Sequence, residues 1–394
     1  MTPRWTLSPV AAALALCALA LPVSIAASNV ARALLTAALL MRARTDGARM
    51  AAAWRSEPAL AALALYAAAG LIAALLSDAP AASLRDALKD WHRLWSLGLF
   101  VAALALEPMT PLRPALWISF AAMALCGLTQ SAQGSAARGT FRAHAFVHPV
   151  VFGEQMALAV LGGLCVLLRP TTQAGRRAAE VFTALVFAAL VMSQTRMALL
   201  AAAAGFGLMA LREPRARRWA VPALIMVASV AAAWEVLPNN GRTLSAIFRP
   251  YDPHNNQQTR LVLWDVARRI FQDHPLTGAG PGGYGSLFAA HHSGILETQA
   301  VWSSAHNLYL HQLAERGLLG GLALLALCAT LLSRALRAAR ADADARALWA
   351  AGAVAVLLAM CLTETSFQNE QFASLFLLIW AWGTTSLRPR AEIL

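Results

Sequence analysis

The sequence predicts an all-α integral membrane protein of about 12 transmembrane helices with one large polar loop. Hydrophobic residues make up 59% of the 394 residues, and the mean hydropathy is +0.55. Only 13% of the residues are charged, whereas a soluble domain carries about 25%. Many apolar runs approach the roughly 20 residues that cross a bilayer. A single long polar stretch, residues 238–304, divides these runs into two groups.

The apolar runs predict nine spans before the polar loop and three after it. The expected spans are 7–26, 28–41, 57–77, 91–106, 113–130, 149–168, 179–194, 196–211, 219–237, 312–332, 347–363 and 371–386. The first run resembles a signal peptide, but topological parity favours a retained span. We therefore divide the chain into nine transmembrane helices with short loops (1–237), a large outer loop domain with amphipathic helices (238–304) and three C-terminal transmembrane helices (305–394).

Arginines are concentrated in alternate connections between the spans. The arginines on one expected side are Arg42, Arg44, Arg49, Arg55, Arg169, Arg176, Arg177, Arg212, Arg215, Arg217, Arg218, Arg334, Arg337, Arg340, Arg346, Arg388 and Arg390. The positive-inside rule makes that side cytoplasmic and places both termini in the cytoplasm. The net charge of +12 therefore indicates topological anchors and contacts with anionic membrane lipids, not a nucleic-acid partner.

The cysteines and histidines give no metal-binding pattern. All five cysteines lie within or near apolar runs, without the spacing of a zinc site or a disulfide framework. His254, His291 and His292 have no carboxylates at the spacing of metal ligands. We expect no metal and no cofactor.

Arginines on the expected outer side oppose the topological rule, and two of them stand out. Arg196 follows the short Ser193–Thr195 connection, which holds its guanidinium at the membrane surface. A charge at the hydrocarbon edge is costly and indicates function, although a snorkelling arginine on lipid phosphate is the structural alternative. Arg260 lies near the start of an expected amphipathic helix, 257–267, where the helix dipole favours a bound anion.

A glycine-rich segment, His274–Gly285, follows that expected helix. Gly278, Gly280 and Gly283 match the dinucleotide fingerprint by spacing, but no preceding strand or βαβ context is present. A backbone turn that packs closely or exposes its N–H groups is the better interpretation.

Further polar candidates lie next to apolar runs on the expected outer side. His306 precedes the expected tenth span, as a catalytic group or as an interfacial or capping residue. Arg142 and His144 lie in the first outer segment, 131–147, and Glu154 follows it as either an arginine partner or a buried structural carboxylate. The segment 81–95 predicts an interfacial helix.

Taken together, these segments resemble the O-antigen ligase family and its superfamily of O-antigen polymerases and protein O-oligosaccharyltransferases. The matching segments are Ser193–Arg196, Arg260 with Trp264, His274–Gly282, and His306–Leu310 followed by Glu315 and Gly317. Gly139–Pro149 is similar to the first outer loop of the family.

The resemblance implies a metal-independent, inverting glycosyltransferase of the GT-C type at the periplasmic face of a Gram-negative inner membrane. It would move O-antigen polysaccharide from undecaprenyl diphosphate to a sugar hydroxyl of lipid A–core, in lipopolysaccharide biosynthesis. Arg196 and Arg260 would bind the diphosphate, because guanidinium groups bind phosphate oxygens bidentately. His306 would be the general base. Arg142, His144 and Tyr309 are further candidates for substrate binding.

Three alternatives to a ligase remain at this stage. A polymerase of the same superfamily would differ chiefly in its acceptor. A polysaccharide or lipid transporter would place paired charges at the bilayer midplane, whereas here they cluster at the outer edge. A non-catalytic polysaccharide receptor would need no base at His306.

Overall fold

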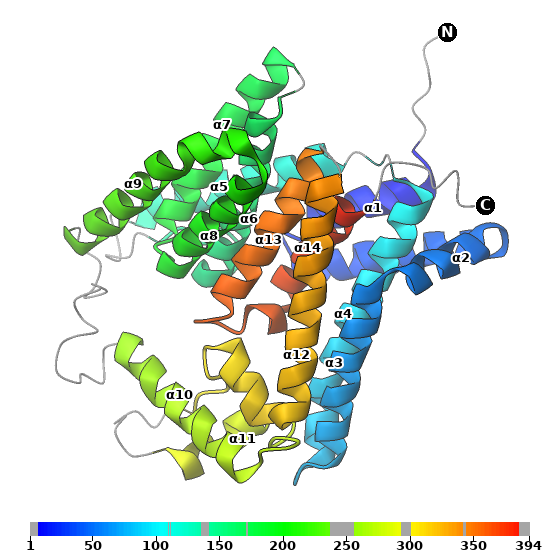
Figure 1. Cartoon of the computed structure of the whole chain (residues 1–394), viewed down its shortest axis with the longest axis vertical. Helices are drawn as coiled ribbons and strands as arrows, with labels where there is room; N and C mark the ends of the chain where they lie inside the picture. Colours follow the sequence, from blue (N-terminus) through cyan, green and yellow to red (C-terminus); the bar gives the residue numbers. More distant parts are fainter. Residues whose placement is uncertain are drawn as a thin grey trace.

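The computed structural model describes residues 7–108, 110, 112–134, 142–170, 172–236, 256–292, 301–341 and 344–385. All regular elements in these residues are helices (Figure 1). They are α1 (Pro9–Ala20), α2 (Ile25–Ser56), α3 (Pro58–Leu75), α4 (Pro80–Leu106), α5 (Leu112–Gly134), α6 (Pro149–Leu168), α7 (Gln173–Met192), α8 (Arg196–Arg212), α9 (Pro214–Val236), α10 (Asn256–Asp273), α11 (Gly283–His291), α12 (Leu308–Ala341), α13 (Ala345–Met360), η2 (Ser366–Gln368) and α14 (Glu370–Thr384).

Each predicted span overlaps a helix. The first, 7–26, corresponds to the shorter α1, and α2 already begins at Ile25. Some helices continue where the sequence suggested a connection. The arginines expected in a loop after residue 41 lie on α2, which runs unbroken to Ser56. The interfacial helix predicted at 81–95 and the following span form one helix, α4. Neither segment contains an internal proline or a glycine cluster that would end a helix.

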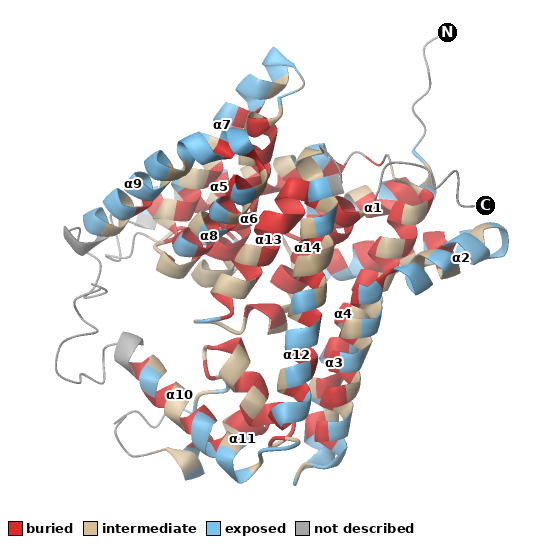
Figure 2. Cartoon of the chain, viewed as in Figure 1, coloured by how far each residue is buried: buried red, intermediate tan, exposed pale blue. Residues whose placement is uncertain are grey.

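Among the described residues, six helices are long and apolar enough to cross a membrane: α2, α3, α5, α6, α9 and α12. Helices α1 and α13 are apolar but shorter. The chain is therefore an all-helical, multi-pass membrane protein, and the count of 12 spans stays a prediction. Burial is greatest in α6, α13 and α14, whereas much of α9 and the far part of α2 is exposed (Figure 2).

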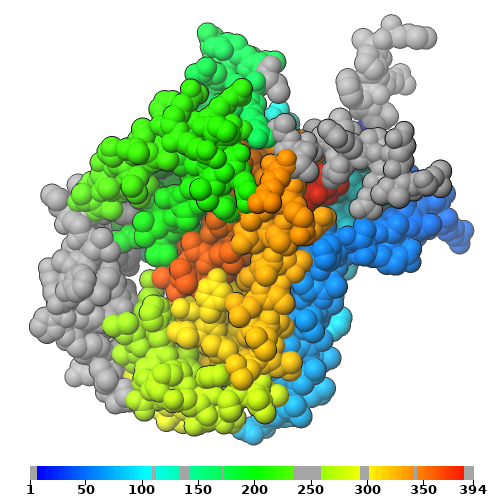
Figure 3. Space-filling model, viewed as in Figure 1, coloured from blue at the N-terminus to red at the C-terminus, as the bar shows by residue number. Residues whose placement is uncertain are grey.

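Helices α10 and α11 form a small helical layer at one end of the molecule, beside α12 (Figure 1). The amphipathic helix predicted at 257–267 is present as α10. Its buried face packs with α11 in a cluster of Val262, Leu263, Val266, Ala267, Ile270, Tyr284, Phe288, Ala305 and Ala314. The space-filling view shows α10 and α11 covering this end together with α3 (Figure 3). Residues 238–255 and 293–300 of the predicted loop domain lie outside the described residues.

Helix α12 is broken at Gly317, whose φ of 58° and ψ of −157° are not helical. A break in a helix leaves carbonyl groups unpaired on one side and N–H groups unpaired on the other. One segment, 275–280, supplies both kinds of partner. The amides of Ala279 and Gly280 donate to the carbonyls of Ala314 and Glu315 at 2.9 and 2.8 Å. The carbonyls of Pro275 and Leu276 accept from the amides of Leu318 and Leu319 at 2.8 and 3.1 Å.

This docking explains the glycines of the His274–Gly285 segment. A Cβ on Gly278 would lie 2.2 Å from the backbone nitrogen of Arg316, and Gly278 has a φ of +70°. A Cβ on Gly317 would lie 2.4 Å from the Leu276 carbonyl carbon. The predicted closely packed backbone turn is thus present, and it joins the α10–α11 layer to α12.

Buried charges reinforce the same junction. Arg316 ends the first part of α12, where the helix dipole favours a cation, and its Nη2 lies 2.6 Å from Asp90 Oδ2 on α4. Arg93 also pairs with Asp90, at 2.6 Å. The Glu315 carboxylate accepts a hydrogen bond from the amide of Gly282 at 2.8 Å. A buried ion pair of this kind is costly to break, so α4, α12 and the glycine-rich segment are held as one unit.

Candidate functional site

His306 stands immediately before α12, and Asn307 fixes its position. The Asn307 side-chain oxygen accepts from the amide of Leu310 at 3.1 Å, as an N-cap does. Its Nδ2 donates to the Leu362 carbonyl at 3.0 Å, and the Leu308 amide donates to the Cys361 carbonyl at 2.9 Å. His306 has a φ of 46°, a left-handed conformation that is rare for a residue other than glycine. The start of α12 is therefore tied to the end of α13, and the His306 backbone is held in an unfavourable conformation.

This tie places Glu364 against His306. His306 Nδ1 and Glu364 Oε2 are 2.8 Å apart. An ionised carboxylate can only accept a hydrogen bond, so the imidazole proton is on Nδ1 and Nε2 is the basic nitrogen. The side chains of His306 and Glu364 are 31% and 14% exposed, so the pair is shielded but accessible.

Glu364 also holds Arg260. The Nη2 group of Arg260 donates to Glu364 Oε1 at 2.5 Å. Arg260 is in the first part of α10, whose apolar face packs on α11 and α12 and so directs Arg260 toward the segment after α13. Two residues predicted from the sequence, His306 and Arg260, are therefore joined by one carboxylate that the sequence analysis did not single out.

Arg196 is the first residue of α8, after a tight turn. Gln194 in this turn has a φ of 52°. Arg142 holds the turn, because its Nε donates to the Ser193 carbonyl at 2.9 Å and its Nη2 donates to Thr195 Oγ1 at 3.3 Å. Arg142 thus stabilises the segment that presents Arg196.

The first outer segment lies close to the His306–Glu364 pair. Partial burial lowers the pKa of His148, and the positive charge of Arg142 lowers it further. Glu364 raises this pKa, whereas His306 and His144 lower it, so His148 lies within electrostatic range of the His306–Glu364 pair. His148 caps α6, since its Nδ1 accepts from the Val150 amide at 3.3 Å. The side chain of His144 is exposed, and its Nδ1 lies 3.1 Å from the Ala145 carbonyl. Residues 139–141 of the predicted outer-loop match lie outside the described residues.

Some polar residues near the site have structural partners. The Tyr309 hydroxyl donates to the Leu358 carbonyl at 3.1 Å and so joins α12 to α13, and a role for Tyr309 in substrate binding stays a prediction. His311 is buried, with its Nε2 3.4 Å from Glu315 Oε2. Glu154 is a buried carboxylate, and its partner is the Ser366 hydroxyl at 2.5 Å rather than an arginine.

A cavity of about 620 Å³ lies beside this region. Its walls are mostly apolar, with polar groups from the start of α6 and the start of α14. The lining residues are Val23, Ser24, Ile25, Ala26, Phe146, Val147, His148, Val151, Asn369 and Gln371. Within the described part of the chain, no group of three or more His, Cys, Asp or Glu residues is arranged to hold a metal ion.

The fold and the site together define a multi-pass helical membrane protein with a histidine, a carboxylate and arginines gathered at one end of its helix bundle. A family profile described as O-Antigen ligase matches residues 181–325. The match supports the assignment of the chain to the O-antigen ligase family, within the superfamily of O-antigen ligases and polymerases. It contains Arg196, Arg260 and His306, whereas Glu364 lies beyond it. A comparison with curated proteins gave no match.

Proposed function

We propose that the chain is an O-antigen ligase, which transfers O-antigen polysaccharide from undecaprenyl diphosphate to a sugar hydroxyl of lipid A–core. The observation that carries this proposal is the Glu364 carboxylate, which lies 2.8 Å from His306 and 2.5 Å from Arg260. Through Glu364, the residue that would take the acceptor's proton, His306, is linked to a residue that would bind the donor's diphosphate, Arg260. The family assignment supports polysaccharide and lipid substrates.

His306 is the general base in this mechanism. As the acceptor hydroxyl oxygen attacks the anomeric carbon, its proton passes to His306 Nε2. The bond between the anomeric carbon and the diphosphate oxygen breaks, and its electron pair leaves with undecaprenyl diphosphate. A single displacement inverts the anomeric centre. Glu364 orients the imidazole through Nδ1 and stabilises the imidazolium that forms, as the buried carboxylate does in a catalytic triad.

Arg260 and Arg196 bind the departing diphosphate. Both are fixed cations, and a preorganised cation stabilises negative charge that develops in the transition state. Arg260 uses one terminal nitrogen for Glu364, and a guanidinium carries further N–H donors that can reach a phosphate oxygen. Arg142 positions Arg196 through the turn before α8. No divalent metal takes part in this mechanism.

The cavity beside His148 receives the lipid-linked substrate. It is mostly apolar and is lined in part by Phe146, Val147 and His148. The charges of His306 and Glu364 both act on His148. In the proposed orientation this end faces the periplasm, both termini are cytoplasmic, and the membrane is the Gram-negative inner membrane. The arginine-rich connections at the other end support that orientation.

The experiment is glycan transfer by the purified protein, with lipid-linked O-antigen as donor and lipid A–core as acceptor. The wild type should transfer, and His306→Gln should bind donor but transfer at least about a hundredfold more slowly, as expected for a lost general base. Wild-type transfer by His306→Gln would refute the mechanism. The lipopolysaccharide of a deletion strain separates the two family activities. A ligase deletion removes all banded glycan and accumulates lipid-linked polymer, whereas a polymerase deletion leaves a single-repeat product.

A further inference from the structure

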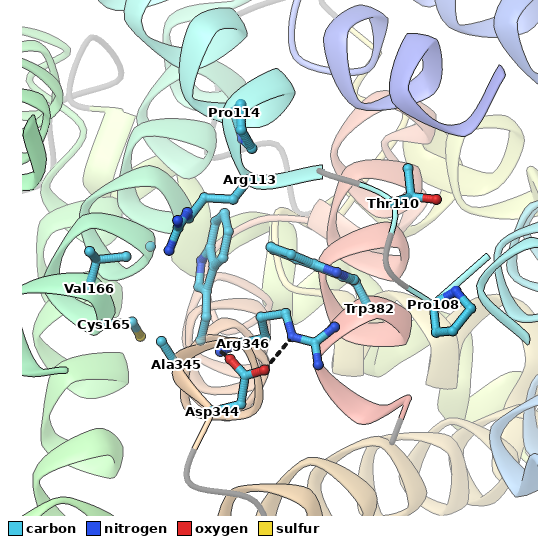
Figure 4. A pocket seen from close by; sticks show the side chains of 12 residues that line it. Pro108, Thr110, Arg113, Pro114, Cys165, Val166, Asp344, Ala345, Arg346 and Trp382 are labelled. Carbon is cyan, nitrogen blue, oxygen red and sulfur yellow. Dashed lines mark hydrogen bonds and ion pairs between the residues drawn. The ribbon is translucent and has the colours of Figure 1, made fainter. Parts of the chain in front are cut away.

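A second cavity has a volume of about 320 Å³ (Figure 4). It lies at the end of the bundle opposite to His306, as the courses of two helices show. Helix α6 begins at the site and ends at this cavity, and α13 begins at this cavity and ends at the site. The lining residues are Pro108, Thr110, Arg113, Pro114, Gly162, Cys165, Val166, Asp344, Ala345, Arg346, Trp349 and Trp382. Its volume is within the roughly 300–1,000 Å³ of small-molecule pockets.

Arg346 is held in place at this cavity while its terminal nitrogens are left for another partner. Its Nε donates to Asp344 Oδ2 at 2.7 Å, and its guanidinium lies over the Trp382 ring, 5.4 Å from the centroid. The other Asp344 oxygen accepts from the Arg346 amide at 2.9 Å. Among the described residues, no acceptor is paired with Nη1 or Nη2 of Arg346. Asp344, the one carboxylate among the lining residues, is therefore already paired with Arg346. The terminal nitrogens of Arg346 form a positively charged edge of the cavity.

Arg113 supplies a second cation from another helix. Figure 4 shows it reaching in from α5, whereas Arg346 comes from the start of α13. Arg113 is exposed, and the described part of the chain offers it no ion-pair partner. Both arginines lie in the first turn of a helix, where the positive end of the dipole adds to their charge. This position is unfavourable for a cation alone, and it becomes favourable when an anion is bound.

The remaining wall suits a ligand with an apolar part. Trp349 and Trp382 meet edge to face with centroids 6.1 Å apart, and the Trp349 indole donates to the Leu158 carbonyl at 2.8 Å. Tryptophan is typical of the membrane–water interface. Gly162, Cys165 and Val166 form an uncharged side of the cavity.

We infer that this cavity binds the phosphate-bearing headgroup of an anionic glycerophospholipid, with the phosphate between Arg113 and Arg346 and the glycerol region against the tryptophans. The shared chemistry is a phosphate, which a lipid or a free anion could supply. The apolar, tryptophan-lined wall favours the lipid. This inference does not depend on the proposed transferase activity.

The test is lipid binding by the purified, delipidated full-length protein, followed by native mass spectrometry and by the midpoint of thermal unfolding. The probes are phosphatidylglycerol, phosphatidylcholine and inorganic phosphate. The variants are Arg346→Gln and Arg113→Gln. Arg113 is exposed, so Arg113→Gln keeps the test valid if Arg346→Gln is unstable. The matched control is Arg177→Gln, on the exposed start of α7 at the same end of the bundle.

Phosphatidylglycerol should bind the wild type and raise its unfolding midpoint, because a ligand that binds only the folded state stabilises it. Each pocket variant should bind at least about tenfold more weakly, the effect of losing one charge-assisted hydrogen bond. Arg177→Gln should bind as the wild type does. Equal binding of phosphatidylcholine, equal binding of inorganic phosphate, or wild-type binding by Arg113→Gln would each overturn the inference.

Discussion

Glu364→Gln isolates the contribution of the carboxylate that joins His306 to Arg260. Glutamine keeps the shape of the side chain and can still accept a hydrogen bond from His306 Nδ1, but it carries no charge. Two unit charges about 4 Å apart interact by roughly 4 kcal/mol at an effective dielectric constant of 20. The 31% and 14% exposure of the two side chains reduces this value. A charge-assisted hydrogen bond of about 1.5–3 kcal/mol is the better guide.

That energy corresponds to a rate of transfer roughly tenfold to a hundredfold lower. Donor binding should stay the same or become tighter, since Arg260 loses its intramolecular partner. The assay is single-turnover glycan transfer with donor binding measured on the same preparation. The matched control is Asp273→Asn, because Asp273 forms a similar pair with His291, also at 2.8 Å, on the α10–α11 layer. Asp273→Asn should transfer normally.

A double-mutant comparison separates positioning from a structural role. If Glu364 acts through His306, Glu364→Gln should have little further effect in the His306→Gln background. An equal loss in both backgrounds would show that Glu364 acts independently of His306. Wild-type transfer by Glu364→Gln alone would refute the reasoning.

Other expected outcomes test separate parts of the structure. Arg196→Lys should lower transfer roughly tenfold to a hundredfold, since lysine lacks the bidentate fork; wild-type transfer would make Arg196 a topological anchor. Asn307→Ala should lower stability by about 1 kcal/mol or more through the lost cap and should slow transfer, measured by thermal unfolding and by the transfer assay. Gly317→Ala should fold poorly, judged by yield of monodisperse protein, whereas Gly207→Ala should fold normally, since an added Cβ there meets nothing within 4 Å. EDTA should leave transfer by the purified protein unchanged; loss with EDTA and rescue by magnesium would contradict the arginine mechanism.

The sequence predicted the helices well because apolar runs and proline or glycine boundaries are local. It predicted α10 from apolar spacing over a few turns, and it identified Gly278–Gly283 as a close backbone turn. It missed the continuation of α2 beyond residue 41, since arginines tolerate both a loop and an exposed helix. The break at Gly317 was also missed, because its partners lie at 275–280, in a different part of the chain.

The candidate site was only partly predictable for the same reason. Arg196, Arg260 and His306 stood out because each is a polar residue at the edge of an apolar run. Glu364 is 58 residues beyond His306 in the sequence. The hydrogen bonds between the start of α12 and the end of α13 bring the two residues together. Glu364 lies between the predicted spans 347–363 and 371–386, as does Glu370, and nothing local distinguishes the two carboxylates. Pairing Glu364 with one particular histidine requires the tertiary structure.

The shared carboxylate gives the proposed mechanism an order of events. Without donor, the single negative charge of Glu364 is divided between Arg260 and His306. A diphosphate bound at Arg260 supplies a competing negative charge and weakens the hold of that arginine on Glu364. The carboxylate would then interact with His306 alone and stabilise the imidazolium that forms when the imidazole accepts a proton. In the proposed mechanism, donor binding would therefore prepare the base for the acceptor, and a sugar hydroxyl would meet a less effective base until the lipid-linked glycan is in place.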